Sequence, residues 1–294
     1  MNKLKKITAV ATLGLVMLTG CGSSAKDKAL ETLDLVGKAE QASSYKTDVN
    51  YTMNLNASYQ EQTLEMALKM DFAIDVLVDA NKMHSQGNMD INFMGNQQKV
   101  ALDMYGYSDG DAYVLATNDG SSDVWRTQTV EQLPDATIQK ESIKTLREMK
   151  MLRGMDGDKV KGKKTNKVVG EIEYETLADM IQILGTGEQM VGIEDYKGMT
   201  FPVTYQFYAD DNRLASVTVD MKSAMKEAMI KSIGTEEAEI NIDAAEFTMI
   251  CYDYNEVKDF TIPEIKTEDS TDASDDEAFV LPTFYLGENE KVFA

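Results

Sequence analysis

Residues 47–78 decide the fold, and they read TDVNYTMNLNASYQEQTLEMALKMDFAIDVLV. Every second residue from Val49 to Tyr59 is apolar or aromatic, and the residues between them are Asn, Thr or Ser. After a polar turn at 60–62, the same alternation runs from Leu64 to Val78. A period of two residues is typical of a strand with one buried and one solvated face. The stretch therefore predicts two consecutive antiparallel strands.

A helix is the alternative for the second of these strands, because residues 64–70 (LEMALKM) are rich in helix formers. In a helix the alternate apolar residues would be scattered around the cylinder, whereas in a strand they share one face. We therefore expect a strand. About thirteen residues at ~3.3 Å each would span roughly 43 Å, well beyond the usual strand of 5–6 residues. Strands of this length favour a large, strongly curved antiparallel sheet with one face turned inward.

The rest of the chain alternates between strand and helix periods. Helices are expected at 27–42, 138–152, 177–184 and 221–233. Further strands are expected at 83–93, 100–104, 112–117, 124–130, 159–175, 201–208, 213–220 and 240–254. From residue 266 the composition becomes Asp, Glu, Ser and Thr, which predicts a disordered acidic tail over 266–294. The short apolar run at 279–286 within that tail either docks loosely or stays free.

The N-terminus predicts a secreted, lipid-anchored protein. Residues 1–20 combine a lysine-rich start with an apolar run from Ile7 to Leu18, which is too short for a membrane span of ~20 residues. The run ends in Leu18-Thr19-Gly20-Cys21, which resembles the bacterial lipobox. That resemblance implies cleavage before Cys21 and attachment of palmitate-type acyl chains to it. Residues 21–26 would then be a tether on the extracytoplasmic face of the cell membrane.

Charge and cysteine content limit the possible binding partners and disulfide bonds. The chain of 294 residues has a formal charge of −21, and loss of the three lysines in residues 1–20 would change it to −24. Such an acidic surface disfavours nucleic acid and repels anionic lipids, so the acyl chains would have to supply the membrane attachment. Once Cys21 is acylated, Cys251 has no partner for an intramolecular disulfide. We expect Cys251 to be a buried strand thiol.

The order of elements resembles a known family. An acyl-anchored cysteine is followed by a helix ending near Ser43-Ser44-Tyr45, a long meander, a helical excursion, a hairpin over Pro202–Asp220, and the closing Tyr254-Asn255-Glu256 through Ile262-Pro263. This order is similar to that of the LolA-like and LppX/LprG-like lipoproteins, including Gram-positive ones, over residues 27–265. The resemblance implies an α+β fold, a half-open antiparallel barrel with helices covering its concave face, where characterised members shelter acyl chains. It carries over no individual binding residue.

The residues offer little support for an enzyme. The single histidine, His84, is expected to face solvent, and no nucleophile elbow, phosphate loop or Cys/His metal spacing is present. Asp109-Gly110-Asp111 and Asp156-Gly157-Asp158 lack the further oxygen ligands of an EF-hand and fit turns instead. No catalytic residue, metal or cofactor is therefore predicted.

Methionine is unusually abundant, with 19 in the chain. Its unbranched, adaptable side chain suits surfaces that accept variable apolar partners, although such residues also fill ordinary cores. The predicted ligand-contacting residues on the apolar face are Met53, Met66, Met70, Phe72, Met83, Met89, Ile91 and Met104. The leading hypothesis is a membrane-anchored lipoprotein that binds or carries a lipid or acyl chain. The alternative is a non-catalytic scaffold with a filled core that recognises another envelope protein.

Overall fold

Among the residues that the structure describes, a single antiparallel sheet of eleven strands forms the body of the protein. The computed structural model describes residues 24–59, 62–110, 112–130, 140–174, 176, 196, 198–233 and 239–266. The strands are β1 (Ser44–Tyr59), β2 (Gln62–Leu77), β3 (Lys82–Phe93), β4 (Asn96–Asp109), β5 (Ala112–Asn118), β6 (Arg126–Val130), β7 (Lys150–Asp156), β8 (Thr165–Glu173), β9 (Thr200–Tyr208), β10 (Leu214–Asp220) and β11 (Glu239–Tyr252). The described helices are α1 (Ala25–Val36), α2 (Lys140–Glu148) and α4 (Lys222–Ile233).

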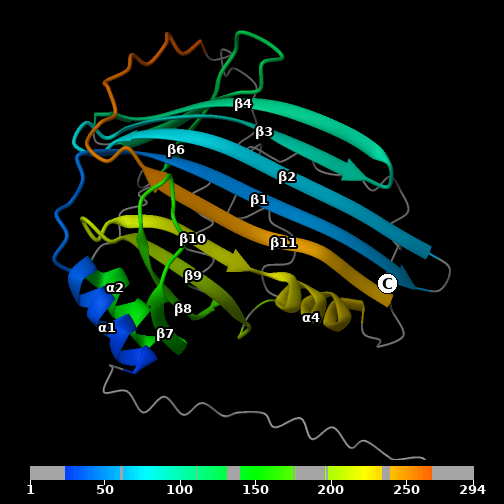
Figure 1. The fold of residues 1–294 in the computed structure, drawn as a ribbon. Coiled ribbons are helices and arrows are strands. Elements are labelled where there is room, and N and C mark those ends of the chain that lie inside the picture. The colour runs from blue at the N-terminus through cyan, green and yellow to red at the C-terminus, as the bar shows by residue number, and fades with distance from the viewer. Residues whose placement is uncertain are drawn as a thin grey trace, which may run out of the picture.

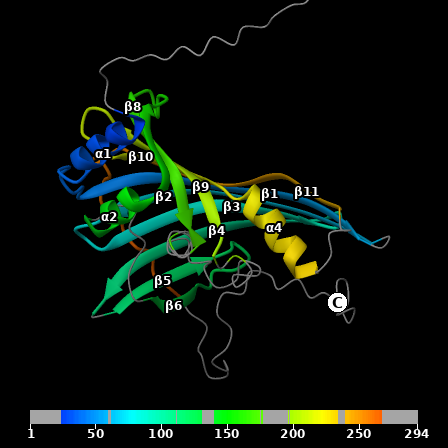
Figure 2. The ribbon, with the colours of Figure 1, turned by 90° about the horizontal axis from the view of Figure 1, so that it is seen from below.

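The sheet is open, with the order β6-β5-β4-β3-β2-β1-β11-β10-β9-β8-β7. Its two edge strands, β6 and β7, have one hydrogen-bonded neighbour each, so the sheet does not close into a barrel. Figures 1 and 2 show long strands that curve along their length in a strongly twisted sheet. The prediction of an α+β protein built on a long antiparallel sheet is confirmed at this level.

The central hairpin forms because its alternation is unbroken. β1 and β2 pair in one register from Ser44 opposite Leu77 to Tyr59 opposite Gln62. β11, from the end of the domain, lies on the other side of β1, with Tyr51 opposite Phe247. The N-terminal meander and the C-terminal strands are therefore joined through the pair β1–β11 (Figure 1).

Helix α1 begins at a capping box. The Ser24 hydroxyl accepts a hydrogen bond from the backbone N–H of Asp27, and the Asp27 carboxylate accepts one from the backbone N–H of Ser24. The Ser24 hydroxyl also donates to the Asp27 carboxylate at 2.7 Å, and this bond, together with the one from the Ser24 N–H, holds the pKa of the Asp27 carboxyl below its usual value. The helix ends at Gly37, so the predicted helix to residue 42 is too long. Leu33, fully buried, anchors the helix in the core.

The prediction that helices cover the concave face is not confirmed. Helix α1 packs chiefly on β7, with smaller contacts to β8 and α2, and α4 packs on β11. Both therefore contact the C-terminal half of the sheet, as Figure 2 also shows for α1 beside β8. The expected helix at 177–184 lies outside the described residues, as does the tail from 267 onward.

Two predicted elements between 138 and 175 are wrong in their bounds. The helix ends at Glu148, and β7 begins at Lys150, so Leu152 belongs to a strand. Met151 has a positive φ of 56°, and the β7–β8 register shifts between Lys150 and Arg153, as at a β-bulge. Residues 159–164 form the turn before β8 rather than part of that strand. The apolar residues here recur at helical spacing, and the bulge interrupts the alternation of the strand. The sequence therefore did not predict β7.

The long hairpins elsewhere follow the predictions closely. β9 and β10 form the expected hairpin, and β11 covers nearly the whole expected strand. Cys251 is buried at 1% exposure, which confirms its predicted place in a strand. Its thiol lies 3.6 Å from the hydroxyl oxygen of Thr47 on the neighbouring strand.

Candidate functional site

The inner face of the sheet carries continuous rows of apolar side chains. We use the term inner face for the side that carries Tyr51, and outer face for the other. Because paired residues point to the same side, the register of neighbouring strands defines these rows. One row passes through Val168, Tyr205, Val217, Met249, Val49, Phe72, Gly87 and Leu102. The next passes through Gly170, Val203, Val219, Phe247, Tyr51, Met70, Met89 and Val100. The inner face is therefore apolar across eight strands, from β8 to β4.

All eight residues predicted to contact ligand lie on this face. Tyr51 pairs with Met70, which pairs with Met89, so two methionines adjoin in the middle of the sheet. Six of the eight are buried and two, Met66 and Met104, are partly buried against the same cluster. The six are Met53, Met70, Phe72, Met83, Met89 and Ile91. The sequence pattern thus placed the whole set on one surface, whereas their role in binding stays a prediction.

The inner face has a low point at Gly87 that the Phe72 ring occupies. A Cβ built on Gly87 would lie 2.4 Å from a Phe72 ring carbon and 2.2 Å from the Asp71 carbonyl oxygen. Carbon atoms need ~3.5 Å or more, so any side chain at residue 87 would displace the ring. Glycine here is required for packing, and its φ plays no part.

Charged side chains lie on the outer face of the central strands. Ion pairs join Lys46 to Asp75 at 3.5 Å and Lys99 to Asp90 at 3.4 Å, all on outward positions. The two inner rows given above contain no Asp, Glu, Lys or Arg. An unpaired charge is costly to bury in such surroundings. The inner face therefore suits an uncharged chemical group.

Few polar groups interrupt the inner face, and burial governs their chemistry. The Tyr51 hydroxyl donates to the Met53 sulfur at 3.7 Å, which is a weak acceptor. Burial raises the pKa of Tyr51 and of Tyr205 far above the usual value for a phenol, so both stay neutral. Ser85 is completely buried, and its hydroxyl has no hydrogen-bond partner among the described residues.

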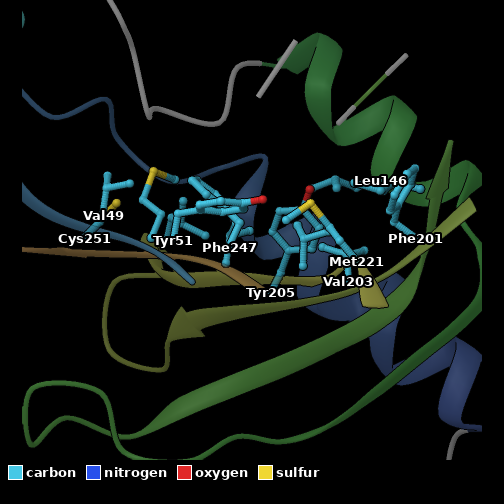
Figure 3. Packing of buried hydrophobic residues seen from close by; sticks show 14 of the residues in the cluster. Val49, Tyr51, Leu146, Phe201, Val203, Tyr205, Met221, Phe247 and Cys251 are labelled. Atoms are coloured by element: carbon cyan, nitrogen blue, oxygen red, sulfur yellow. The ribbon is translucent and has the colours of Figure 1, made fainter. Parts of the chain in front are cut away.

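On β9–β11, this face is covered by a side chain of α2 and by Met221 (Figure 3). Leu146 of α2 lies beside Phe201, and Met221, just before α4, lies beside Tyr205 and Val203. Tyr205 and Phe207 stack with ring centroids 6.3 Å apart. This region is therefore a packed core rather than an exposed surface.

His84 lies on the outer face, as predicted, but it is packed rather than free in solvent. Its Nε2 lies 2.8 Å from an Asp103 carboxylate oxygen, and its ring stacks on Tyr105 at 4.2 Å between centroids. Phe260, from the segment after β11, covers both rings at 5.8 and 6.4 Å. Side chains thus cover the imidazole from two sides. Sequence reasoning missed this cluster because Phe260 is far from His84 along the chain.

The segment 256–266, here called the C-terminal strap, crosses the outer face of β3 and β4. The Asp259 carboxylate pairs with Lys82 at 3.2 Å, and Phe260 lies over Tyr105. Further along, the backbone N–H of Trp125 donates to the carbonyl oxygen of Lys266 at 2.8 Å. The strap therefore joins the end of the domain to the meander strands on the side opposite the methionines.

Metal ligation and membrane-spanning helices have no support among the described residues. No group of three or more His, Cys, Asp or Glu side chains there is arranged to hold a metal ion. Within the same residues, no helix is both long and apolar enough to cross a bilayer.

Comparison with known proteins identifies no family. No family model and no curated protein matches the sequence. A solved β-barrel-like protein of domain of unknown function DUF1849 from Brucella abortus aligns with a TM-score of 0.22 and 8% identity, over 72% of this chain and 96% of that one. A DUF1329 family protein from Desulfovibrio piger aligns with a TM-score of 0.18 and 8% identity, over 79% and 94%. Scores this low carry no functional conclusion.

Proposed function

We propose that this protein is an extracytoplasmic lipoprotein, anchored through Cys21, that binds an uncharged apolar ligand on the inner face of its sheet. The ligand would be a lipid or an acyl chain within a half-barrel of the kind that the LolA-like resemblance implies. The observation that carries the proposal is the uncharged, methionine-rich inner face of β1–β4. Methionine adapts its shape to apolar partners at little cost, which favours a surface with a variable occupant.

The second candidate is a scaffold whose inner face is an ordinary core. Met70 and Met89 are exposed by only 3% and 1%, and this dense packing is the observation that favours it. The two functions differ in one physical respect. A carrier has a space that ligand can enter beside these side chains, whereas a filled core has no such space.

Substitution of Met70 separates the two candidates. In a carrier, Met70→Ala should cost less than the ~2–5 kcal/mol expected in a closed core, because no sealed void forms. Met70→Trp should then fold normally and reduce uptake of a fluorescent acyl probe. In a filled core the same tryptophan should destabilise by about 1–3 kcal/mol through overpacking. Urea unfolding and probe titration measure the two effects.

Ala73→Trp is the matched control, because Ala73 is exposed on the outer face of the same strand. This control should change neither stability nor probe uptake. Native mass spectrometry of the protein purified from its own membrane identifies any bound lipid. A destabilised Met70→Trp variant, together with a wild-type protein that binds no acyl probe, would refute the carrier and leave the scaffold.

A further inference from the structure

One segment of this acidic protein is strongly basic. Residues 150–169, which form β7, the β7–β8 turn and the start of β8, contain 7 of the 29 lysines and arginines but 2 of the 50 acids. Their own net charge is +5 in a chain of net charge −21. Glu173, Asp48 and Asp210, which lie outside the segment, pair with three of its cations, so the surface keeps a charge of +2. A concentration of one sign of charge attracts partners of the other sign over about a Debye length.

Part of this charge fastens the turn to the sheet. Lys161 pairs with Asp48 at 2.8 Å and lies over the Tyr252 ring at 3.9 Å. Beneath the turn, Val160 packs in a small cluster of its own with Tyr208 and Ala215. The turn is therefore held in a defined place over the outer face, which gives the remaining cations fixed positions.

Three cations of the segment have no ion-pair partner among the described residues: Arg153, Lys159 and Lys164. All three are exposed. Beside Arg153 on β7 lie two of the most exposed large apolar residues among those described, Met151 at 60% and Met155 at 42%. Exposed methionines on either side of the unpaired Arg153, with Lys159 and Lys164 in the turn that follows, form an amphipathic edge, here called the basic edge. This is the composition of surfaces that lie at the lipid headgroup level.

The tether places this edge close to the membrane. Ser24, the N-cap of α1, is three residues from Cys21, a distance of at most ~11 Å in a fully extended chain. Helix α1 in turn lies directly on β7, because a Cβ on Gly154 would come within 2.3 Å of the Ala29 backbone nitrogen. The exposed Lys26 and Lys28 in the first turn of α1 add to the positive charge there. An acyl chain on Cys21 would thus hold β7 within reach of the headgroups.

We propose that β7 and the β7–β8 turn form the membrane-facing edge of the protein and bind anionic phospholipid headgroups. This inference rests on the proposed anchoring at Cys21. Lysine and arginine contact the phosphates, and Met151 and Met155 enter the interface between them. The net negative charge of the remaining surface then repels the bilayer, so the protein stands with this edge down and the open sheet held in a fixed orientation.

Headgroup quenching tests the orientation. The lipidated full chain, reconstituted in vesicles of phosphatidylcholine and phosphatidylglycerol, carries a fluorophore on Met155→Cys or, as the matched control, on Met94→Cys. Met94 is equally suited to labelling, being 50% exposed at the β3–β4 turn. A nitroxide on the lipid headgroup should quench the label at 155 and leave the label at 94 unchanged. Equal quenching at both positions would overturn the proposal.

Charge reversal tests the headgroup contact without the anchor. The mature chain carrying Cys21→Ser should bind vesicles that contain phosphatidylglycerol and not pure phosphatidylcholine, and added salt should weaken binding. Lys159→Glu with Lys164→Glu should weaken it by about tenfold or more, given about fivefold per surface lysine. The control, Lys226→Glu with Lys258→Glu, changes the charge equally at exposed positions outside the segment. Equal losses from both pairs, or binding without anionic lipid, would contradict the proposal.

Failure of this inference can be distinguished from failure of the proposed function. An unacylated Cys21 in the wild-type protein, seen by mass spectrometry, would refute the anchor, while the Cys21→Ser chain still tests the basic edge. A protein that binds no acyl probe, yet is quenched at 155 and not at 94, would refute the carrier and keep the orientation. Binding of an acidic protein with no response to anionic vesicles would overturn the membrane contact.

Discussion

Single residues fix how the elements approach one another. Gly154 and Gly87 are each required because another chain segment occupies the space of a Cβ: the Ala29 backbone in one case and the Phe72 ring in the other. Neither has a positive φ, so the requirement is one of contact. At Gly154 the close approach fixes the position of α1 on β7, because a backbone cannot move aside as a flexible side chain can.

Replacing Gly154 by alanine should therefore loosen α1 from β7. The added methyl group meets the Ala29 backbone nitrogen at 2.3 Å, and overpacking of this kind costs about 1–3 kcal/mol. Urea denaturation followed by circular dichroism measures the loss. Gly37→Ala is the control, because Gly37 has helical φ and ψ and its Cβ would meet the Ile143 side chain at 3.4 Å. Equal stability of the two variants would contradict the assigned contact.

At the scale of elements, the strap extends the domain beyond its last strand. It places Phe260 over an aromatic cluster on β3 and β4, and it ends with Lys266 bonded to Trp125. A segment without regular secondary structure is ordered here because side chains and one backbone hydrogen bond hold it at several points.

Two truncations distinguish the strap from the tail. Removal of residues 267–294 should shift Tm by no more than about 3 °C, because the acidic residues 267–277 include too few apolar groups to offset the entropy of ordering them. Removal of residues 258–294 also deletes Phe260 and should lower Tm further, by several degrees, since burying such a ring contributes about 1–3 kcal/mol. Trp125, the only tryptophan, reports the difference. Its emission should change on the second truncation alone, and a large Tm loss on the first would show that the tail packs on the domain.

The whole molecule has two faces of opposite chemistry. The ion pairs of the central strands and the strap lie on the outer face, and the apolar rows with Met70 and Met89 lie on the inner face. Tyrosines are distributed through both regions, and several are buried with their hydroxyl groups. The Tyr254 hydroxyl donates to the Leu214 carbonyl oxygen at 2.6 Å, and that of Tyr208 to the Cys251 carbonyl at 2.8 Å. Buried phenol groups of this kind make the free energy of unfolding depend on pH in the alkaline range.

Burial raises the pKa of Tyr51, Tyr205, Tyr208 and Tyr254, and raises the pKa of Tyr252 to about 12. The folded state therefore holds these protons more tightly than the unfolded state, in which phenols titrate near ~10. The contribution of these tyrosines to the free energy of unfolding is fully present below pH ~10 and is lost as the pH rises above it. Absorbance at the tyrosinate band should show fewer than the 13 tyrosines titrating near pH ~10 until the protein unfolds. Titration of all 13 near that pH with native circular dichroism would contradict the assignment.

Anchoring of the whole molecule depends on Cys21. Cys21→Ser in the precursor should block both acylation and signal removal at that site, because the lipobox cysteine carries the acyl group that its resemblance implies. Mass spectrometry of the mature N-terminus is the measurement. A wild-type protein without acyl mass, or cleaved at another residue, would refute the anchor.

The sequence pattern was sufficient to predict an element where one period of apolar side chains continues along its whole length. The sequence predicted β1 to β5 and the membership of all eight inner-face residues, because alternation ties each side chain to a face whatever the strand pairs with. It failed at β7, where the bulge at Met151 breaks the period, and at the end of α1, which Gly37 terminates early. At Met151 a single backbone conformation outweighs the pattern of apolar residues. Gly37 still has helical φ and ψ, and the chain leaves the helix in the turn that follows it.

The sequence by itself determined the strands whose alternation is unbroken, their inward faces and the charge of the chain, since each is a property of neighbouring residues. Only the tertiary structure decided that β11 pairs with β1, that Phe260 covers His84, and that the basic turn lies against Asp48. Lys161 and Asp48 are 113 residues apart. Contacts over such separations form when the whole sheet brings distant segments together, and no local period encodes them.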